Sequence, residues 1–229
     1  MAGNGTRGDD GDAGPAVEAQ LNRPHSIAFD SQDRLYIADI GNHRIRRVDW
    51  ESGIIHSIAG TGAKELPKSG QLARDHPVLG PRALFIRGDV LWVALREGHS
   101  IWKIDLAQGT WQHVAGSGEK GFTPGITAAA DARFNGPKGL AIGPTQTVYV
   151  VDTENQVIRA IDPQRQTVST LAGQGPEFRG FGGDGDLALT AMLNRPHGIC
   201  VDNQGRVYIG DSENHRVRLV GKLPATPSR

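Results

Sequence analysis

The chain has 229 residues, and its 25 lysines and arginines balance 25 aspartates and glutamates, so the formal net charge is zero. A balanced charge argues against a surface built for nucleic acid or an anionic membrane, and we expect neither as a partner. No apolar run approaches the length of a membrane-spanning helix, and residues 1–10 contain no apolar core of a signal peptide. The sequence as written therefore predicts a cytoplasmic protein, whereas a longer natural N-terminus would make a secreted or periplasmic one.

Internal repetition dominates the sequence. The motif Ala-Gly-x-Gly occurs four times, and successive copies lie 56 or 57 residues apart. A proline recurs in the same register, with spacings of 56 to 59 residues. A fixed period in this range is typical of solenoids and propellers. The motif glycines are Gly3, Gly60, Gly116 and Gly173, and the prolines are Pro24, Pro81, Pro137 and Pro196.

Each repeated proline precedes the same series of short apolar segments. In the first unit these are residues 26–30, 35–39, 45–48 and 54–58, which are rich in β-branched and aromatic residues and are separated by polar turns. A glycine-rich link then leads to the next proline. We expect the first strands to begin near Ile27, Leu84, Leu140 and Ile199. The units cover residues 21–62, 79–118, 134–175 and 193–220, the last together with residues 1–6, in a single domain of residues 1–229.

Four strands per unit without a helical period predict an all-β propeller with antiparallel blades. Ile45 and Val48 are three residues apart within one segment, and the other units repeat this spacing. Such spacing indicates either a bulge or a sheet that is buried on both faces. Cys200 should be a buried, inert thiol. We expect these core residues: Ile27, Ile37, Val93, Leu140, Val150, Ile199 and Ile209.

The two ends leave the last blade short of a strand. Its third strand ends near Val220, and Pro224 and Pro227 make the tail a poor fourth strand. Either residues 1–6 close the blade in a four-bladed ring, or the chain is part of a longer, six-bladed propeller, which we favour. An incomplete blade exposes the edge of the strand at 216–220, and exposed edges recruit other strands, so we expect self-association.

The loops after the second strands carry a recognisable motif. Asp39-Ile40-Gly41-Asn42-His43-Arg44-Ile45 and Asp211-Ser212-Glu213-Asn214-His215-Arg216-Val217 contain Asn-His-Arg. The third unit keeps Asp152-Thr153-Glu154-Asn155, and the second has the degenerate Leu95-Arg96-Glu97-Gly98-His99-Ser100. In these motifs the chain resembles bacterial-type NHL-repeat β-propellers. The resemblance implies the fold but not the function, because that family includes ligand sensors, interaction scaffolds, RNA-binding domains and a metal-dependent amidating lyase.

In a propeller, the proline loops, the loops after the second strands and the glycine-rich links share one face, at the mouth of the central channel. We expect a ligand there. The Asp-x-x-Asn turns also have a structural interpretation, since Asp and Asn cap backbone amides in turns. The predicted binding residues are Arg23, His25, Asp39, Asn42, Asp152, Asn155, Arg195, His197, Asp211 and Asn214.

Two metals can be considered. The resemblance to the amidating lyase implies zinc on histidines that follow the repeated prolines, and His25 and His197 fit, but Arg82 and Lys138 hold the other two positions and make a poor cage. Calcium would use the acidic links at residues 9–12 and 182–186, which lack the ligand spacing of an EF-hand. We therefore expect no zinc, no calcium and no other cofactor.

No nucleophile elbow, phosphate-binding loop or paired-cysteine motif names a reaction. The sequence thus favours a non-enzymatic propeller that acts as a binding or scaffold module for a protein, a peptide or a small polar ligand. The alternative is a metal-dependent lyase or hydrolase that uses the axial histidines.

Overall fold

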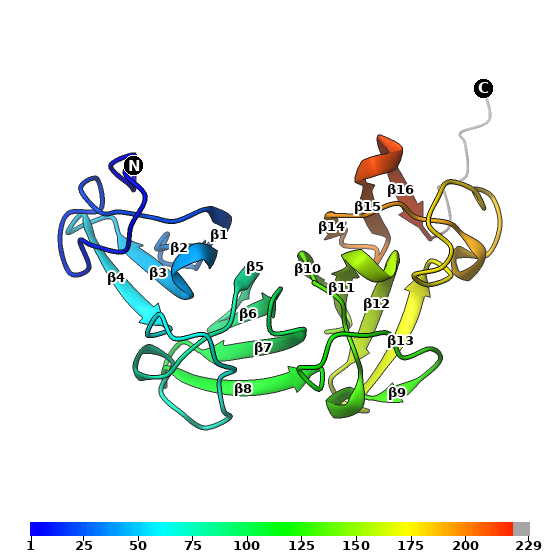
Figure 1. Ribbon diagram of the computed structural model, residues 1–229, viewed down its shortest axis with the longest axis horizontal. Helices are drawn as coiled ribbons and strands as arrows, with labels where there is room; N and C mark the ends of the chain where they lie inside the picture. The colour runs from blue at the N-terminus through cyan, green and yellow to red at the C-terminus, as the bar shows by residue number, and fades with distance from the viewer. Residues whose placement is uncertain (222–229) are drawn as a thin grey trace.

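The four sequence units fold into four antiparallel sheets that follow one another along an open arc (Figure 1). The computed structural model describes residues 1–221, so the tail with Pro224 and Pro227 lies outside the described residues. Residues 1–221 contain no α-helix, only six short 3₁₀ turns, and hence no helix long and apolar enough to cross a membrane. The prediction of an all-β propeller arrangement is confirmed.

Within each blade the strands run in sequence order outwards from the hollow of the arc (Figure 1). The first blade consists of β1 (Pro24–Phe29), β2 (Leu35–Asp39), β3 (Arg44–Asp49) and β4 (Ile54–Ala59). The second consists of β5 (Pro81–Arg87), β6 (Val90–Leu95), β7 (Ser100–Asp105) and β8 (Thr110–Ala115). The third consists of β10 (Gly139–Ile142), β11 (Val148–Asp152), β12 (Val157–Asp162) and β13 (Thr167–Ala172), with β9 (Thr127–Ala128) on its outer edge. The fourth has β14 (Gly198–Val201), β15 (Val207–Asp211) and β16 (Arg216–Val220).

The predicted strand starts and the irregular spacing both have structural counterparts. The inner strands β1, β5, β10 and β14 contain the four expected starting residues. In the first blade the register between β3 and β4 shifts directly after Ile45, and β7 and β12 shift at the equivalent position. Ile45 and Val48 are both fully buried. The three-residue spacing therefore reflects a bulge together with burial of both sheet faces.

Neighbouring blades are joined by apolar packing and by one recurring hydrogen bond. Side chains of the first blade, such as Tyr36 and Ala38, pack against Leu91 and Val93 of the second. In each of the first three blades, one side chain of the turn after the second strand accepts the backbone N–H of a residue just before the next blade. These contacts are His43 Nδ1 with Gly80 (3.1 Å), His99 Nδ1 with Gly136 (3.1 Å) and Gln156 Oε1 with Arg195 (2.6 Å). We call them the interblade clamps.

The repeated Ala-Gly motif is explained by close backbone contact. Gly60 has a φ of +88°, and a Cβ atom there would collide with the carbonyl oxygen of His43. Gly116 and Gly173 stand in the same relation to His99 and Gln156. Only glycine combines a positive φ with such a close contact to another backbone segment. In the first three blades the motif glycine therefore lies against the backbone of the residue that forms the interblade clamp.

Two core predictions fail at the ends of the arc. Ile37, Val93, Leu140, Val150 and Ile209 are buried as expected, and Ile199 is partly buried, but Ile27 is 62% exposed. Cys200 is also exposed, against expectation. Ile27 lies on the outer face of the first blade and Cys200 on that of the fourth. No further blade covers these faces within residues 1–221, so alternating side chains there remain in solvent.

The N-terminal segment does not complete the fourth blade. The backbone N–H groups of Gly3 and Asn4 donate to the carbonyls of Ala16 (2.8 Å) and Ala19 (2.9 Å), beside the first blade. The chain start and β16 lie at opposite ends of the arc (Figure 1). The alternative in which residues 1–6 close the last blade is therefore wrong for this structure, and β16 has no outer neighbour among the described strands.

Candidate functional site

In every blade the repeated proline and the polar or charged residue after it lie at the start of the inner strand or directly before it. The loops after the second strands add further charged groups on the same side, since Glu154 bonds to Lys138 and to Arg195. We call the whole set the channel-mouth cluster. Its members are Arg23, His25, Arg82, Arg96, Glu97, Lys138, Glu154, Arg195, His197 and Glu213.

Lys138 is the best-connected cation of this cluster. Its ammonium donates to Glu154 Oε1 (2.8 Å) and lies 3.3 Å from His197 Nε2. Burial lowers the pKa of Lys138, although Glu154 opposes the shift. Burial also tends to raise the pKa of Glu154, but hydrogen bonds from Lys138 and Arg195 outweigh it, so that pKa is lowered. Glu154 is therefore an ionised carboxylate shared by two cations.

Arg82 is the opposite case. Its side chain is partly buried, and within residues 1–221 it makes no ion pair and no side-chain hydrogen bond. Burial lowers its pKa, and Arg96 lowers it further. The positive charge of Arg82 also acts on His25 and His197, whose pKa values fall through partial burial and then through neighbouring cations. An unpaired guanidinium thus sits close to both axial histidines.

The predicted aspartates and asparagines bond to one another within the fold. Asp39, Asp152 and Asp211 are completely buried. Each carboxylate accepts a backbone N–H from a residue 17 positions earlier and an amide N–H from the asparagine three positions later. The backbone donors are Asn22, Asn135 and Asn194 (2.7, 2.7 and 2.8 Å), and the amide donors are Asn42, Asn155 and Asn214 (2.7, 2.8 and 2.8 Å). These bonds tie the three carboxylates into the fold, whereas Arg23, His25, Arg195 and His197 belong to the channel-mouth cluster. A ligand contact by any of the ten residues stays a prediction.

A buried arginine that we did not single out from the sequence completes each of these networks. Arg46 lies 3.7 Å from Asp39 and 3.1 Å from Asp12, and Arg218 likewise contacts Asp211 and Asp184. The acidic links considered for calcium therefore supply partners for arginines. Arg159 takes the same position in the third unit. In the second unit Leu95 and Trp102 replace the aspartate and the arginine, and both are buried.

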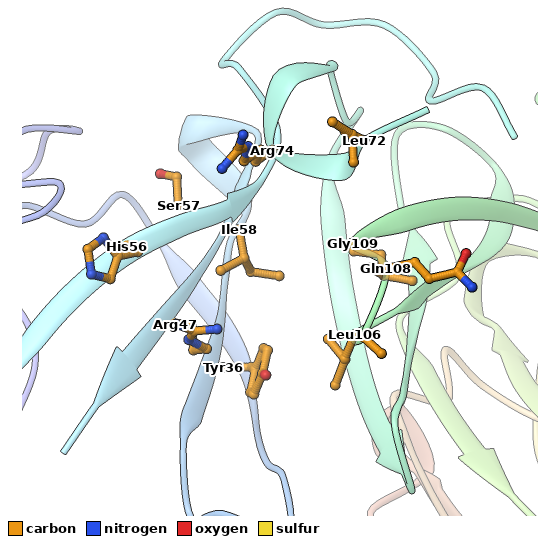
Figure 2. A pocket seen from close by; sticks show the side chains of 12 residues that line it. Tyr36, Arg47, His56, Ser57, Ile58, Leu72, Arg74, Leu106, Gln108 and Gly109 are labelled. Carbon is orange, nitrogen blue, oxygen red and sulfur yellow. The ribbon is translucent and has the colours of Figure 1, made fainter. Parts of the chain in front are cut away.

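Two cavities bear on ligand binding. One of about 550 Å³ lies within the channel-mouth face, lined by Arg96, Glu97, His99, Lys120 and Glu154 among others. A second, of about 600 Å³, lies between the first two blades, away from the cluster, with Tyr36 and Ile58 on one side and Leu106 on the other (Figure 2).

Two polar groups of the second cavity are already engaged. Arg47 pairs with Asp49 (2.9 Å), and the Tyr36 hydroxyl donates to Asp30 (3.0 Å). Burial and Asp30 raise the pKa of Tyr36 to about 12. We place the candidate site at the channel-mouth cluster, which the cavity of about 550 Å³ touches through Arg96, Glu97 and Glu154.

The predicted metal candidates are poorly placed for a metal. The ammonium of Lys138 occupies the Nε2 side of His197, where it opposes a divalent cation. Within residues 1–221 no group of three or more histidine, cysteine, aspartate or glutamate side chains is arranged to hold a metal ion.

Comparison with known proteins identifies the repeat. Residues 21–48 and 193–218, in the first and fourth units, match the family profile described as NHL repeat. The chain therefore contains NHL repeats in its first and fourth units. Of the two units outside this match, the second lacks the buried aspartate and arginine, and the third has both.

The NHL-repeat chain is similar to parts of longer proteins. It is 28% identical to Protein SUPPRESSOR OF QUENCHING 1, chloroplastic, from Arabidopsis thaliana, over 93% of this chain and 21% of that protein. It is 27% identical to NHL repeat-containing protein 2 from Homo sapiens, over 89% of this chain and 31% of the relative. The chain thus spans less than a third of these relatives.

Solved structures share the fold. A Bacteroides thetaiotaomicron protein of unknown function aligns with a TM-score of 0.65 at 25% identity, over 86% of this chain and 46% of that one. An auxiliary nutrient binding protein from the same organism aligns with a TM-score of 0.67 at 22% identity, over 89% and 49%. The NHL-repeat chain therefore spans about half the length of each.

Proposed function

We propose that this NHL-repeat chain is a non-enzymatic binding module whose ligand contacts the channel-mouth cluster. The observation that carries the proposal is the convergence of charged side chains from all four blades on one face, including a partly buried Arg82 without a counterion. Concave sites with a few converging polar groups are where proteins bind ligands. Like charges placed close together repel one another and lower the stability of the fold. A propeller that acted only as a spacer between other domains would not need them.

Binding can be tested with a chemically diverse set of probes. A mixed library of small acids, bases, neutral polar molecules and short peptides would be screened against the full chain by NMR, with backbone amides as reporters. We expect hits to shift the amides around His25, Arg82 and His197, and not those that line the cavity of Figure 2 around Leu106. A screen without any hit at the channel mouth would refute the proposed function.

The proposal contains no catalytic metal, because Lys138 blocks one of the two axial histidines that the lyase alternative requires. Metal analysis of the purified protein tests this point directly. A stoichiometric zinc ion that disappears in the His25→Ala variant would favour the lyase.

A further inference from the structure

We infer that the ligand at the channel mouth is a small molecule carrying an oxyacid anion, either a carboxylate or a phosphate, bound by the guanidinium of Arg82 with His25 and His197 as its neighbours. This inference rests on the proposed function of the channel-mouth face and specifies the ligand chemistry.

Charge accounting in the cluster points to an anion. Five cations, Arg23, Arg82, Arg96, Lys138 and Arg195, face three carboxylates. Every carboxylate already has a partner. Glu97 pairs with Arg96 (2.8 Å), Glu154 with Lys138 (2.8 Å) and Arg195 (3.1 Å), and Glu213 with Arg195 (3.8 Å). Arg82 forms no ion pair among residues 1–221, although Glu97 is near enough to raise its pKa.

The chemistry of arginine narrows the ligand class. A guanidinium presents its N–H donors in a planar fork that matches the two oxygens of a carboxylate or a phosphate. Arg82 is held beside a second cation, Arg96, and the one carboxylate of Glu97 offsets only one of these two positive charges. The structure therefore keeps an anion-binding group in place at an electrostatic cost.

The two axial histidines can add hydrogen bonds to the same anion. Lys138 can only donate, so His197 Nε2 accepts from it, and the neutral ring carries its proton on Nδ1. His197 faces Lys138, Arg195, Arg82 and Glu154, while His25 faces Arg82, Arg23, Arg96 and Glu97. Partial burial and these cations keep the pKa values of both histidines low in the free protein, and a bound anion would raise them. Affinity for an anion should therefore increase as the pH falls.

The geometry favours a small molecule over a nucleic acid. The cations surround one mouth instead of forming a long stripe, and the formal net charge of the chain is zero. A nucleic-acid surface needs a basic patch that follows the phosphate backbone. Single-stranded RNA is therefore an alternative for the test to exclude.

The test uses the full chain with inorganic phosphate, succinate, the neutral molecule glycerol and a ten-nucleotide single-stranded RNA as probes, each followed by NMR and calorimetry. We expect phosphate or succinate to shift amides near Arg82, glycerol to have no effect, and Arg82→Gln to weaken anion binding at least tenfold. Arg82→Lys should bind with intermediate affinity because it keeps the charge and loses the fork. The matched control is Arg74→Gln, since Arg74 is exposed at the other cavity. Wild-type binding should tighten between pH 7.5 and 5.5, and less so in His25→Gln and His197→Gln.

Comparison with the library screen separates the two proposals. If library hits map to the channel mouth but are neutral or basic, and Arg82→Gln binds them normally, the inference fails and the proposed function stands. An equal loss of anion binding in Arg74→Gln and Arg82→Gln would show a non-specific charge effect and overturn the inference. Tighter binding of RNA than of either small anion, abolished by Arg82→Gln, would overturn the assignment to a small molecule. Thermal unfolding of each variant establishes that it is folded.

Discussion

At the scale of single residues, the position of the buried aspartate and arginine is filled in two ways: by a polar pair in the first unit and by an apolar pair in the second. In the first unit, Asp39 and Arg46 face each other in the interior, and Asn42 bonds to the same carboxylate. In the second unit, Leu95 and Trp102 fill the equivalent positions with apolar groups. A buried ion pair and a well-packed apolar pair can be similarly stable, whereas half of an ion pair is not.

We predict that Asp39→Ala lowers the free energy of unfolding by about 3 kcal/mol, because Arg46 and the backbone N–H of Asn22 lose their buried acceptor. The triple variant Asp39→Leu, Asn42→Gly and Arg46→Trp copies the second unit and should recover most of this loss. Urea denaturation measures both. A triple variant as unstable as the single one would show that the two forms are not interchangeable.

The same residues show what the sequence can and cannot predict. Asp-x-x-Asn is recognisable as a turn, and a structural role is one of the two interpretations that the pattern allows. Burial of Asp39 is not evident from the sequence, since its main donor lies 17 residues earlier and Arg46 seven residues later. One sequence signal could have revealed the buried arginines that we missed: Arg46, Arg159 and Arg218 occupy the same position in three of the four repeats.

At the scale of the strand, the interblade clamps distinguish histidine from glutamine. His43 and His99 accept a backbone N–H through Nδ1, which requires a neutral ring, while Gln156 performs the same task at any pH. Burial lowers the pKa of His43 and of His99 below the ordinary value of 6.5, and Lys120 lowers that of His99 further. These two histidines therefore bind protons more readily in the unfolded chain than in the folded one. Each clamp contributes its full stability above pH 6.5 and loses it as the pH falls below that value.

We predict that the double variant His43→Gln and His99→Gln loses less stability than the wild type between pH 7.5 and pH 5. Each retained hydrogen bond should be worth about 1 kcal/mol at the acidic end. His215→Gln is the control, because His215 holds the same repeat position without a clamp partner among residues 1–221. Equal slopes for the double variant and the wild type in chemical denaturation would contradict the clamp mechanism.

A second prediction at this scale concerns two isoleucines paired across neighbouring strands. Ile37 on β2 is 3% exposed, while its partner Ile27 on β1 is 62% exposed. Ile37→Ala should cost about 2–5 kcal/mol through lost contacts and a residual cavity. Ile27→Ala should change the free energy of unfolding by less than about 0.5 kcal/mol. Thermal denaturation of both variants checks the contrast, and a large loss in Ile27→Ala would mean that something covers β1 in solution.

At the scale of the whole molecule, the arc ends in two uncovered blade faces. Ile27 and Phe29 are exposed on the first blade and Val217 on the fourth. Each end also carries one partner of an interblade clamp that is not formed within residues 1–221. These partners are the backbone N–H of Arg23, at the first blade, and the ring of His215, at the fourth. Arg23 has the positive φ found in Gly80, Gly136 and Arg195. The faces at the ends therefore resemble the interfaces that join blades inside the chain.

We predict concentration-dependent self-association in which the first blade of one copy contacts the fourth blade of another. Val217→Lys should weaken it by placing a charge on an apolar contact. Val17→Lys is a suitable control, since Val17 is also exposed but lies outside the strands. Sedimentation over a hundredfold concentration range measures the effect. A wild-type chain that stays monomeric throughout would exclude this mode of association.

The overall fold is largely predictable because the signals for it are repeated four times. Strand order, strand starts and the shared face all follow from spacing alone. Exposure of Ile27 and Cys200 is not predictable in the same way, since a repeat pattern assigns every unit the same neighbours and the end units lack one. The site is predictable in part. The sequence places Arg82 and Lys138 beside the axial histidines, but only the structure shows that Lys138 has partners and that Arg82 has none within residues 1–221.

The uneven distribution of tryptophan gives the molecule a built-in optical reporter. Trp92, Trp102 and Trp111 all lie buried in the second blade, and the rings of Trp102 and Trp111 meet edge to face with centroids 6.1 Å apart. Trp50 in the first blade is 44% exposed, and three of the four tryptophans lie in the second blade. Intrinsic fluorescence therefore follows mainly one blade, whereas far-ultraviolet dichroism averages over all four. In repeat arrays each unit is stabilised mainly by its neighbours, and the terminal units have the fewest. Because the second blade is flanked on both sides, the fluorescence transition should occur at higher denaturant than the dichroism transition whenever the end blades fray first.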